Sequence, residues 1–560
     1  MLKFSQQPIE TKLKFLQKDA EERDAARRAN EEGLPYLDVK RQVIDRGALE
    51  IVPEVLARET KTAVFTKEGS KVKVAAYSSQ SSAFEKLSLF LDEQKFKKEI
   101  VIVSLSGLEE VWKHYLAIRP ENQVEIVSEI TLSEGAIAAK ENIKTIEAAS
   151  EDIAQIDGDT PTTDALIKIL TDALALKVSD VHLEPGRGSV QLRYRVDGIL
   201  YDIARISEEV GRRVTGRLKL LASLKLNIKD EPQDGRFTIK RSKGEDVEVR
   251  LSVVPSEFGE AVVMRVLDPS VVDLDMNDLG LRRDDLEIIE RFLKEANGMI
   301  LVTGPTGSGK TTTLYAFLKR NSSPEVKIIT IEDPIEYHLD GIQQTQVKTK
   351  ESYTFASGLR SILRQDPDMI LVGEIRDSET ATTAIDAALT GHLVFSTLHT
   401  NNAPGAIPRL VDLKAKVSSL ASALRLVVAQ RLVRKLCEKC KQPVKIDGEL
   451  KAKLGAFQEQ LPERVARPSR MELYESVGCT LCNKGFEGRV GIFELLTFDE
   501  EMAEILGKEV SEVRVRKAAR AKGMVYMQED GILKALSGVT TIEEVEKVTG
   551  PINWPASSVK

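Results

Sequence analysis

The chain has little cysteine, few aromatic residues and no excess of basic charge. Only four of its 560 residues are cysteine, and they form two pairs, Cys437/Cys440 and Cys479/Cys482. Cysteine this scarce excludes the disulfide framework of a small secreted protein. With 80 Lys and Arg against 87 Asp and Glu, the net charge is −7. That balance argues against a chain whose main task is to coat nucleic acid.

The sequence also lacks any long apolar run. Its most apolar stretches, such as residues 299–302 and 369–372, have the length of single strands, far below the about 18 to 20 residues that span a bilayer. The first four residues lead into a densely charged stretch, where a signal peptide would have an apolar core. We therefore expect a cytoplasmic protein that reaches a membrane only through a partner.

What the chain does have is enough length and apolar content for several cores. At about 100 to 200 residues per domain, its length predicts about three to five domains, and 42% of its residues are hydrophobic. Mixed strand and helix patterns predict a multidomain α/β protein. The predicted division is residues 1–127, an α/β docking domain; 128–160, an acidic linker; 161–272, a second α/β domain; 273–434, a third; 435–497, a cysteine-bearing subdomain; and 498–560, a helical region.

The third domain shows the clearest strand pattern. Apolar runs at 299–303, 327–331, 369–372 and 393–396 alternate with stretches of helical character. Strands that are apolar throughout are typical of a parallel sheet covered by helices on both faces.

The most specific motif follows the first of these strands. Residues 304–311 read Gly-Pro-Thr-Gly-Ser-Gly-Lys-Thr, which fits the phosphate-binding pattern G-x-x-x-x-G-K-[ST]. Backbone N–H groups and a helix N-terminus cradle the phosphates, Lys310 reaches the β and γ phosphates, and the Thr311 hydroxyl holds Mg²⁺. The predicted ATP-binding residues are Gly304, Pro305, Thr306, Gly307, Ser308, Gly309, Lys310, Thr311 and Thr312.

Two further strands end in carboxylates. Glu332 follows residues 328–331 directly, whereas Gly373 separates Glu374 from the strand at 369–372. Because ligands of open α/β sheets bind at the carboxyl ends of the strands, both side chains should lie near the phosphates. One could orient Mg²⁺ and its water while the other takes a proton from the attacking water.

Histidine is rare, with five residues in the chain, and two of them flank the strand at 393–396. A histidine at a strand end is often packed or serves as a cap. Its place on the nucleotide-bearing sheet favours a functional role for His399 and, less so, for His392.

The cysteines fit a metal site. Each C-x-x-C pair presents two sulfurs, and four thiolates favour Zn²⁺ in a closed, structural site. The 38 residues between the pairs exceed the common zinc-ribbon spacing. We predict Zn²⁺ ligation by Cys437, Cys440, Cys479 and Cys482.

Together, the phosphate loop, the stretch 330–336, the Gly-Glu pair at 373–374 and the stretch 391–400 resemble the ATPases of type II secretion and type IV pilus assembly. The resemblance covers about residues 164–538. It implies a RecA-like motor domain at 273–434. It also implies that Glu332 is the general base, that Glu374 serves Mg²⁺ and water, and that His399 is a sensor near the γ phosphate.

The second domain resembles the domain that precedes the motor in the same family. The matching stretches are 179–185, 193–198 and 233–236, and the resemblance implies a PAS-like fold. It further implies that Arg250 and Arg265 approach the nucleotide, where a guanidinium would neutralise developing charge. Whether they act within one chain or across a subunit interface stays open.

The outer regions resemble the family as well. Pilus assembly and secretion members carry the four-cysteine insert, and retraction members lack it. Residues 34–38 and 51–54 resemble the family's N-terminal domain more loosely, and the Arg-Leu-Gly stretch by which some members bind cyclic di-GMP is absent. We predict docking to a membrane platform protein in place of dinucleotide sensing.

These expectations combine into a cytoplasmic, hexameric ATPase, peripheral to the inner membrane, that drives pilin assembly through a platform protein with ATP, Mg²⁺ and Zn²⁺. A type II secretion ATPase driving pseudopilus assembly is the first alternative. A nucleic-acid translocase should have a basic, aromatic-bearing channel, which this acidic chain with 16 Phe, 10 Tyr and 2 Trp does not offer. Intact Glu332 and Glu374 argue against a nucleotide-switched regulator without motor activity.

Overall fold

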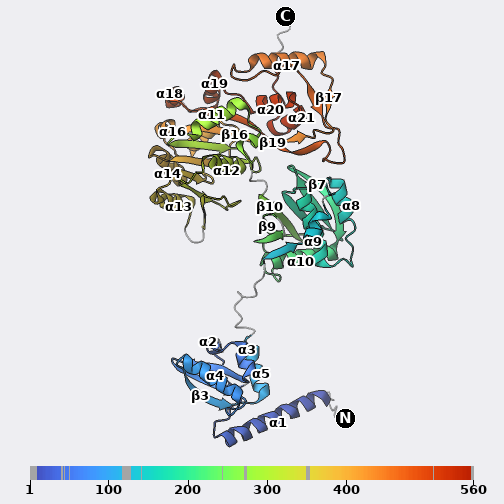
Figure 1. The fold of residues 1–560 in the computed structure, drawn as a ribbon, viewed down its shortest axis with the longest axis vertical. Coiled ribbons are helices and arrows are strands. Elements are labelled where there is room, and N and C mark those ends of the chain that lie inside the picture. The colour runs from blue at the N-terminus through green and yellow to red at the C-terminus, as the bar shows by residue number, and fades with distance from the viewer. Residues whose placement is uncertain are drawn as a thin grey trace, which may run out of the picture. The chain divides into compact units, whose positions relative to one another are not determined.

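The chain folds into two compact units that divide between residues 127 and 128 (Figure 1). The computed structural model describes residues 9–39, 42, 44–49, 51–115, 128–140, 142–241, 244–269, 274–348, 353–508 and 510–555. None of the helices formed by these residues has the length and hydropathy of a membrane span.

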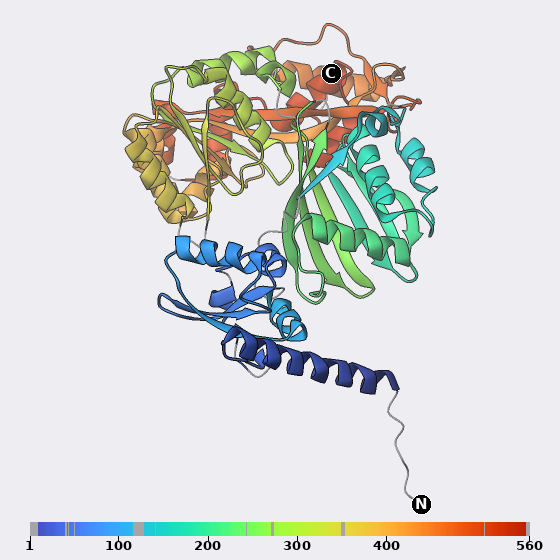
Figure 2. The ribbon, with the colours of Figure 1, turned by 60° about the horizontal axis from the view of Figure 1, so that its bottom comes forward.

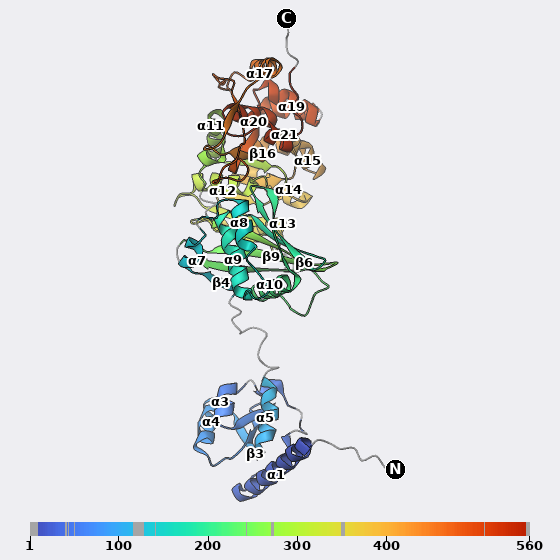
Figure 3. The ribbon, with the colours of Figure 1, turned by 90° about the vertical axis from the view of Figure 1, so that its right-hand side faces the viewer.

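The first unit is a small α/β domain around a sheet of order β1-β2-β3. The first two strands form an antiparallel hairpin, and β3 runs parallel to β2, so the chain must cross over between β2 and β3 through α4. Helix α1 lies beside β3 and α5 (Figure 3). The elements are α1 (Ile9–Glu32), α2 (Arg46–Leu49), α3 (Glu54–Glu59), β1 (Thr62–Glu68), β2 (Lys71–Ala76), α4 (Ser82–Glu93), β3 (Lys97–Ile102) and α5 (Leu105–Lys113).

The second unit begins with a mixed sheet of order β4-β8-β9-β10-β5-β6-β7. Burial alternates along its strands, because helices α8, α9 and α10 cover only one face (Figure 2). The elements are β4 (Glu129–Leu132), α7 (Glu134–Ala138), α8 (Ile146–Ile153), α9 (Thr162–Ala175), β5 (Asp180–Gly186), β6 (Ser189–Val196), β7 (Ile199–Ser207), α10 (Glu208–Leu221), β8 (Gln233–Arg241), β9 (Val247–Ser256) and β10 (Gly259–Leu267).

The stretch 128–160 differs from the predicted acidic linker. Strand β4 pairs with β8 of the second domain, and Leu132, Ile146 and Ile153 are buried in that domain's core. The acidic residues of this stretch are interspersed with apolar ones at strand and helix spacing. The apolar residues are the ones that decide its packing.

The third domain contains the predicted parallel sheet, in the order β13-β12-β14-β15-β11-β16-β19. All neighbours are parallel except β16 and β19. Helices α11 and α12 pack on one face, and α13, α14 and α16 on the other. Figure 3 shows α11 and α12 on one side of this domain and α14 on the other. The elements are η3 (Met276–Leu279), α11 (Arg283–Leu293), β11 (Gly298–Thr303), α12 (Lys310–Asn321), β12 (Ile328–Glu332), β13 (Gln343–Gln346), α13 (Phe355–Ile362), η5 (Leu363–Gln365), β14 (Met369–Val372), α14 (Ser378–Leu389), β15 (Leu393–Leu398), α15 (Ala406–Asp412), α16 (Val417–Ala423), β16 (Leu424–Leu436) and β19 (Phe486–Thr497).

The cysteine-bearing subdomain is an insertion between the two antiparallel strands of this sheet. Strand β16 leads into the first cysteine pair and β19 returns from the second. The C-terminal helices pack against the same sheet and the insertion. The remaining elements are β17 (Gln442–Val444), α17 (Gly448–Gln460), β18 (Leu473–Glu475), α18 (Glu500–Lys508), α19 (Glu512–Ala521), α20 (Met527–Leu536) and α21 (Ile542–Thr549).

Candidate functional site

The phosphate loop joins the fully buried strand β11 to helix α12. Two of its glycines are required by the close approach of β16. A Cβ on Gly304 would lie 2.5 Å from the backbone carbonyl oxygen of Gln430, and a Cβ on Gly309 would lie 2.9 Å from the side-chain nitrogen Nε2 of Gln430. Gly309 also has a φ of +88°, which L side chains rarely adopt. The loop therefore keeps its shape only with glycine at these positions.

The polar groups of the loop fit a phosphate chain. Lys310 Nζ donates to the carbonyl oxygens of Gly304 at 2.9 Å and Pro305 at 3.0 Å, and burial lowers the pKa of Lys310. The buried Ser308 hydroxyl has no hydrogen-bond partner among the described residues. No described side chain caps the start of α12, so its first amides remain donors. An anion would satisfy these groups together.

Gln430 of β16 packs against the phosphate loop. The sequence patterns did not indicate this residue. The Thr313 hydroxyl of α12 donates to Gln430 Oε1 at 2.7 Å, and both side chains are buried. In the sequence, Gln430 could have been found as the one amide side chain that directly follows the apolar residues 426–429. Buried polar side chains need partners, and here the partner is the helix that carries Lys310.

Glu332, the last residue of β12, is 3% exposed. It accepts hydrogen bonds from the hydroxyl of Thr330 at 2.6 Å, from Gln344 Nε2 at 3.2 Å and from the hydroxyl of Tyr315. Burial raises the pKa of Glu332, and these donors oppose the rise. Tyr315 belongs to α12, so Glu332 links the phosphate-loop helix to β12. Sequence reasoning missed Tyr315 and Gln344, which come from separate elements.

Glu374 lies in a different environment, and the structure explains its displacement by one residue. A Cβ on Gly373 would lie 3.3 Å from the Cα of Glu332, so the packing of β14 against β12 favours glycine there and the acid follows it. Glu374 forms an ion pair with Arg376, and its Oε2 lies 3.3 Å from His399 Nε2. Glu374 also raises the pKa of Lys310, against the larger effect of burial. These relations link Glu374 electrostatically to the phosphate loop.

The two histidines at the ends of β15 lie in different environments. His399 has a side chain 53% exposed beside Glu374. His392 Nδ1 lies 3.1 Å from the carbonyl oxygen of Ala387, which is the packed arrangement expected of a structural histidine.

Arg250 and Arg265 lie opposite each other on β9 and β10. Arg250 donates to the carbonyl oxygen of Ile335 at 2.7 Å and forms an ion pair with Glu336 at 3.0 Å. Arg265 forms an ion pair with Asp180 at 3.1 Å. Both arginines line a cavity of about 1780 Å³ between this sheet and residues 334–348. In this arrangement their contacts are with these neighbours and not with the phosphate loop.

The four cysteines gather as predicted. Their sulfur atoms all lie within 4.8 Å of one another, and Cys482 Sγ lies 3.7 Å from Cys440 Sγ and 3.6 Å from Cys479 Sγ. Tetrahedral zinc with Zn–S bonds of about 2.3 Å requires sulfurs about 3.8 Å apart. The cluster therefore has the ligand number and spacing of a closed Cys₄ zinc site.

We expect freshly purified, reduced protein to contain one equivalent of zinc, measured by elemental analysis. Cys479→Ser should lose the metal and have a lower melting temperature, because the binding of the metal contributes to the free energy of folding. Ser476→Ala, in the same loop but outside the cluster, is the control. Less than about half an equivalent of zinc in the wild type would contradict a zinc site.

A glycine-rich phosphate loop and strand-end carboxylates on a parallel sheet define a RecA-like P-loop ATPase. The family described as type II/IV secretion system protein matches residues 155–547, and the chain belongs to it. It is 36% identical over 525 residues to the type IV pilus assembly ATPase PilB of Myxococcus xanthus, covering 93% of this chain and 89% of that protein. It is 45% identical over 401 residues to type II secretion system protein E of Pseudomonas aeruginosa, covering 71% and 78%.

A solved structure supports the same fold. The ATPase DotB of Legionella pneumophila aligns with a TM-score of 0.53 and 23% identity, over 70% of this chain and 97% of that one. The chain is thus an ATPase of the secretion and pilus assembly class, as its motifs predict.

Proposed function

We propose that this protein is the motor that hydrolyses ATP to assemble type IV pilin through an inner-membrane platform protein. The observation that carries the proposal is the extent of the alignment with the M. xanthus pilus ATPase. It covers 93% of the chain and 89% of the relative, whereas the alignment with the secretion protein covers 71% of the chain. A shared N-terminal region favours a shared docking partner.

A type II secretion ATPase that drives pseudopilus assembly is the second candidate. The higher identity to the P. aeruginosa protein, 45% against 36%, favours it. That alignment spans 401 of the 560 residues, and both machines need an ATPase motor.

The residues at the phosphate loop suggest a division of labour. Lys310 and the first amides of α12 bind the β and γ phosphates, and Thr311 holds Mg²⁺. Bound there, the metal would supply positive charge that neutralises the phosphate oxygens. Glu332 takes a proton from the attacking water, Glu374 orients that water and the metal, and His399 contacts the γ phosphate through its place beside Glu374.

Motion follows from the two arginines of the second domain. ATP binding draws Arg250 and Arg265 away from Glu336 and Asp180 towards the phosphates, and this closes the second domain on a motor domain. Product release opens it again. Six chains in a ring perform these steps and turn them into work on the platform protein.

The outer parts have supporting roles in this proposal. The cysteine cluster holds Zn²⁺ as a structural metal, and the unit formed by residues 1–127 docks on the platform protein. The motor works in the cytoplasm at the inner membrane face, and nucleic acid is not its substrate.

Deleting the gene distinguishes the two machines. We expect surface pili, counted by electron microscopy, to disappear while the secretion of extracellular enzymes continues, and a plasmid copy should restore pili. Loss of secreted enzymes with normal pili would contradict pilus assembly and identify the secretion motor.

A further inference from the structure

The loop after His399 is fastened to the strand that carries the phosphate loop. Thr400 donates its backbone N–H to the hydroxyl of Thr303 at 3.0 Å, and the two hydroxyls lie 2.5 Å apart. Thr303 is the last residue of β11, directly before Gly304. A shift of this loop therefore reaches the first residue of the phosphate loop.

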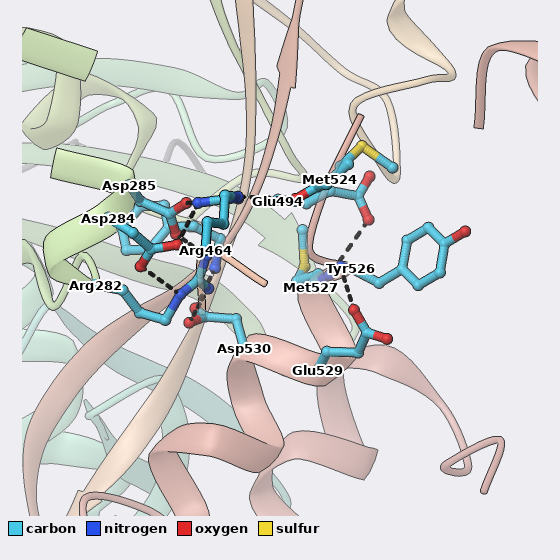
Figure 4. A network of polar contacts seen from close by, with 12 residues as sticks. Arg282, Asp284, Asp285, Arg464, Glu494, Met524, Tyr526, Met527, Glu529 and Asp530 are labelled. Carbon is cyan, nitrogen blue, oxygen red and sulfur yellow. Dashed lines mark hydrogen bonds and ion pairs between the residues drawn. The ribbon is translucent and has the colours of Figure 1, made fainter. Parts of the chain in front are cut away.

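The same loop is held elsewhere by two carboxylates: Asn402 Nδ2 donates to Glu512 Oε1 at 2.9 Å, and the backbone of Ala403 donates to the buried Glu494. Glu494 of β19 accepts the backbone N–H of Ala403 at 2.9 Å on one oxygen, and that of Met527 at 3.3 Å on the other. Met527 is the first residue of α20 (Figure 4). Glu494 thus connects the loop to the start of a C-terminal helix.

Glu494 is an unusual residue for a purely structural position. It is 4% exposed, and no Lys or Arg in the described part of the chain forms an ion pair with it. Burial raises the pKa of Glu494, and the two amides oppose the rise. A buried carboxylate outside an ion pair is costly, and the charge of Arg516 lowers the pKa of Glu494 only as a smaller effect than the two amides. A glutamate can accept from both amides at once, whereas a glutamine offers one acceptor oxygen and one donor nitrogen.

Helix α20 is itself locked to β19 beside Glu494. The backbone N–H of Phe493 donates to Asp530 Oδ2 at 2.8 Å, and Arg282 donates to Asp530 Oδ1 at 2.7 Å. Figure 4 shows Arg282 and Asp530 on one side of the helix start and Glu494 on the other. Strand β19 and α20 therefore hold each other through neighbouring residues, 493 and 494, so a displacement of the loop passes to the helix.

We propose that Glu494 is a positioning residue that couples the loop of residues 399–405 to helix α20. It holds the loop in register with Thr303 for hydrolysis, and it transmits the nucleotide state of the motor to the C-terminal helices. This inference rests on the proposed role of His399 in hydrolysis.

Two substitutions test it through different atoms. Glu494→Gln keeps the shape of the side chain and removes one acceptor. Met527→Pro removes the amide donor at the first helical position, where proline is tolerated, and Tyr526 already has the extended conformation that precedes proline (φ −71°, ψ 150°). Met527→Ala is the matched control, because it loses the same buried side chain and keeps the N–H.

We expect Glu494→Gln and Met527→Pro each to lower kcat about tenfold, with KM for ATP changed less than about twofold, as for the loss of one hydrogen bond to a charged group. Met527→Ala should keep kcat within about twofold of the wild type. His399→Ala should lower kcat further in the wild type than in Glu494→Gln, since both changes act on one loop. Steady-state ATPase assays below each variant's melting temperature give these values.

The outcomes separate this inference from the proposed function. A wild type without ATPase activity would contradict the proposed function itself. An active wild type with unchanged kcat in Glu494→Gln would overturn the coupling. If Glu494→Gln does not fold, the comparison of Met527→Pro with Met527→Ala decides. Equal kcat in that pair would overturn the inference. Loss of fold in Met527→Pro alone would also overturn it, because Glu494 would then have a structural role only.

Discussion

Replacing Lys310 by alanine is expected to abolish ATP hydrolysis and to weaken ATP binding about 100-fold or more. The reason is that Lys310 is the cation within the phosphate loop, partly buried and held by two loop carbonyls. A charge-assisted contact to phosphate in such a site is worth several times a solvent-exposed one. Fluorescent nucleotide titration measures the affinity, and phosphate release measures the turnover.

The matched control for this change is Lys453→Ala. Lys453 lies on α17 and forms an exposed ion pair with Glu449, which contributes little to stability. It should retain wild-type affinity and turnover. An unchanged ATP affinity in Lys310→Ala would contradict the assignment of residues 304–311 as the phosphate loop.

Glu374→Gln is expected to lower kcat by about 10² to 10⁴ while ATP still binds. Glutamine keeps the shape of the side chain but removes the charge that orients water and metal, and losses of this size are typical of groups that act in proton transfer or its alignment. The neighbours Arg376 and His399 keep the side chain placed. Single-turnover hydrolysis and nucleotide binding, measured separately, give the two parts.

Glu449→Gln on α17 is the control for Glu374→Gln and should keep the kcat of the wild type.

Glu332→Gln should also lower kcat, and it should in addition lower the melting temperature. Glu332 accepts bonds from Thr330, Gln344 and Tyr315, and a glutamine would point its amide at some of these donors. Turnover of Glu374→Gln equal to the wild type would contradict a motor and favour a nucleotide-switched regulator.

Much of the site could be predicted because its parts are contiguous in the chain. The eight residues of the phosphate loop carry their own turn, helix start and lysine, so pattern and chemistry coincide. The cysteine pairs are similar, since each C-x-x-C is a local unit, although the chain between them had to fold before the four sulfurs met. The apolar strands predicted the parallel sheet for the same local reason.

The stretch 128–160 shows where a local pattern misleads. Its acidic, small residues are typical of a linker, yet Ile146 and Ile153 are buried and β4 completes the second sheet. Composition averages over residues, whereas packing depends on the few apolar side chains that find a surface to cover.

The sequence by itself determined that this protein binds a nucleoside triphosphate on a parallel α/β sheet and that four thiols form one cluster. Only the tertiary structure decided which donors surround each carboxylate. Glu494 and Ala403, for example, are 91 positions apart, and no local pattern relates them. The physical reason is that strand tips and helix starts from distant segments meet at one sheet edge, where burial makes each polar group depend on the partner that folding supplies.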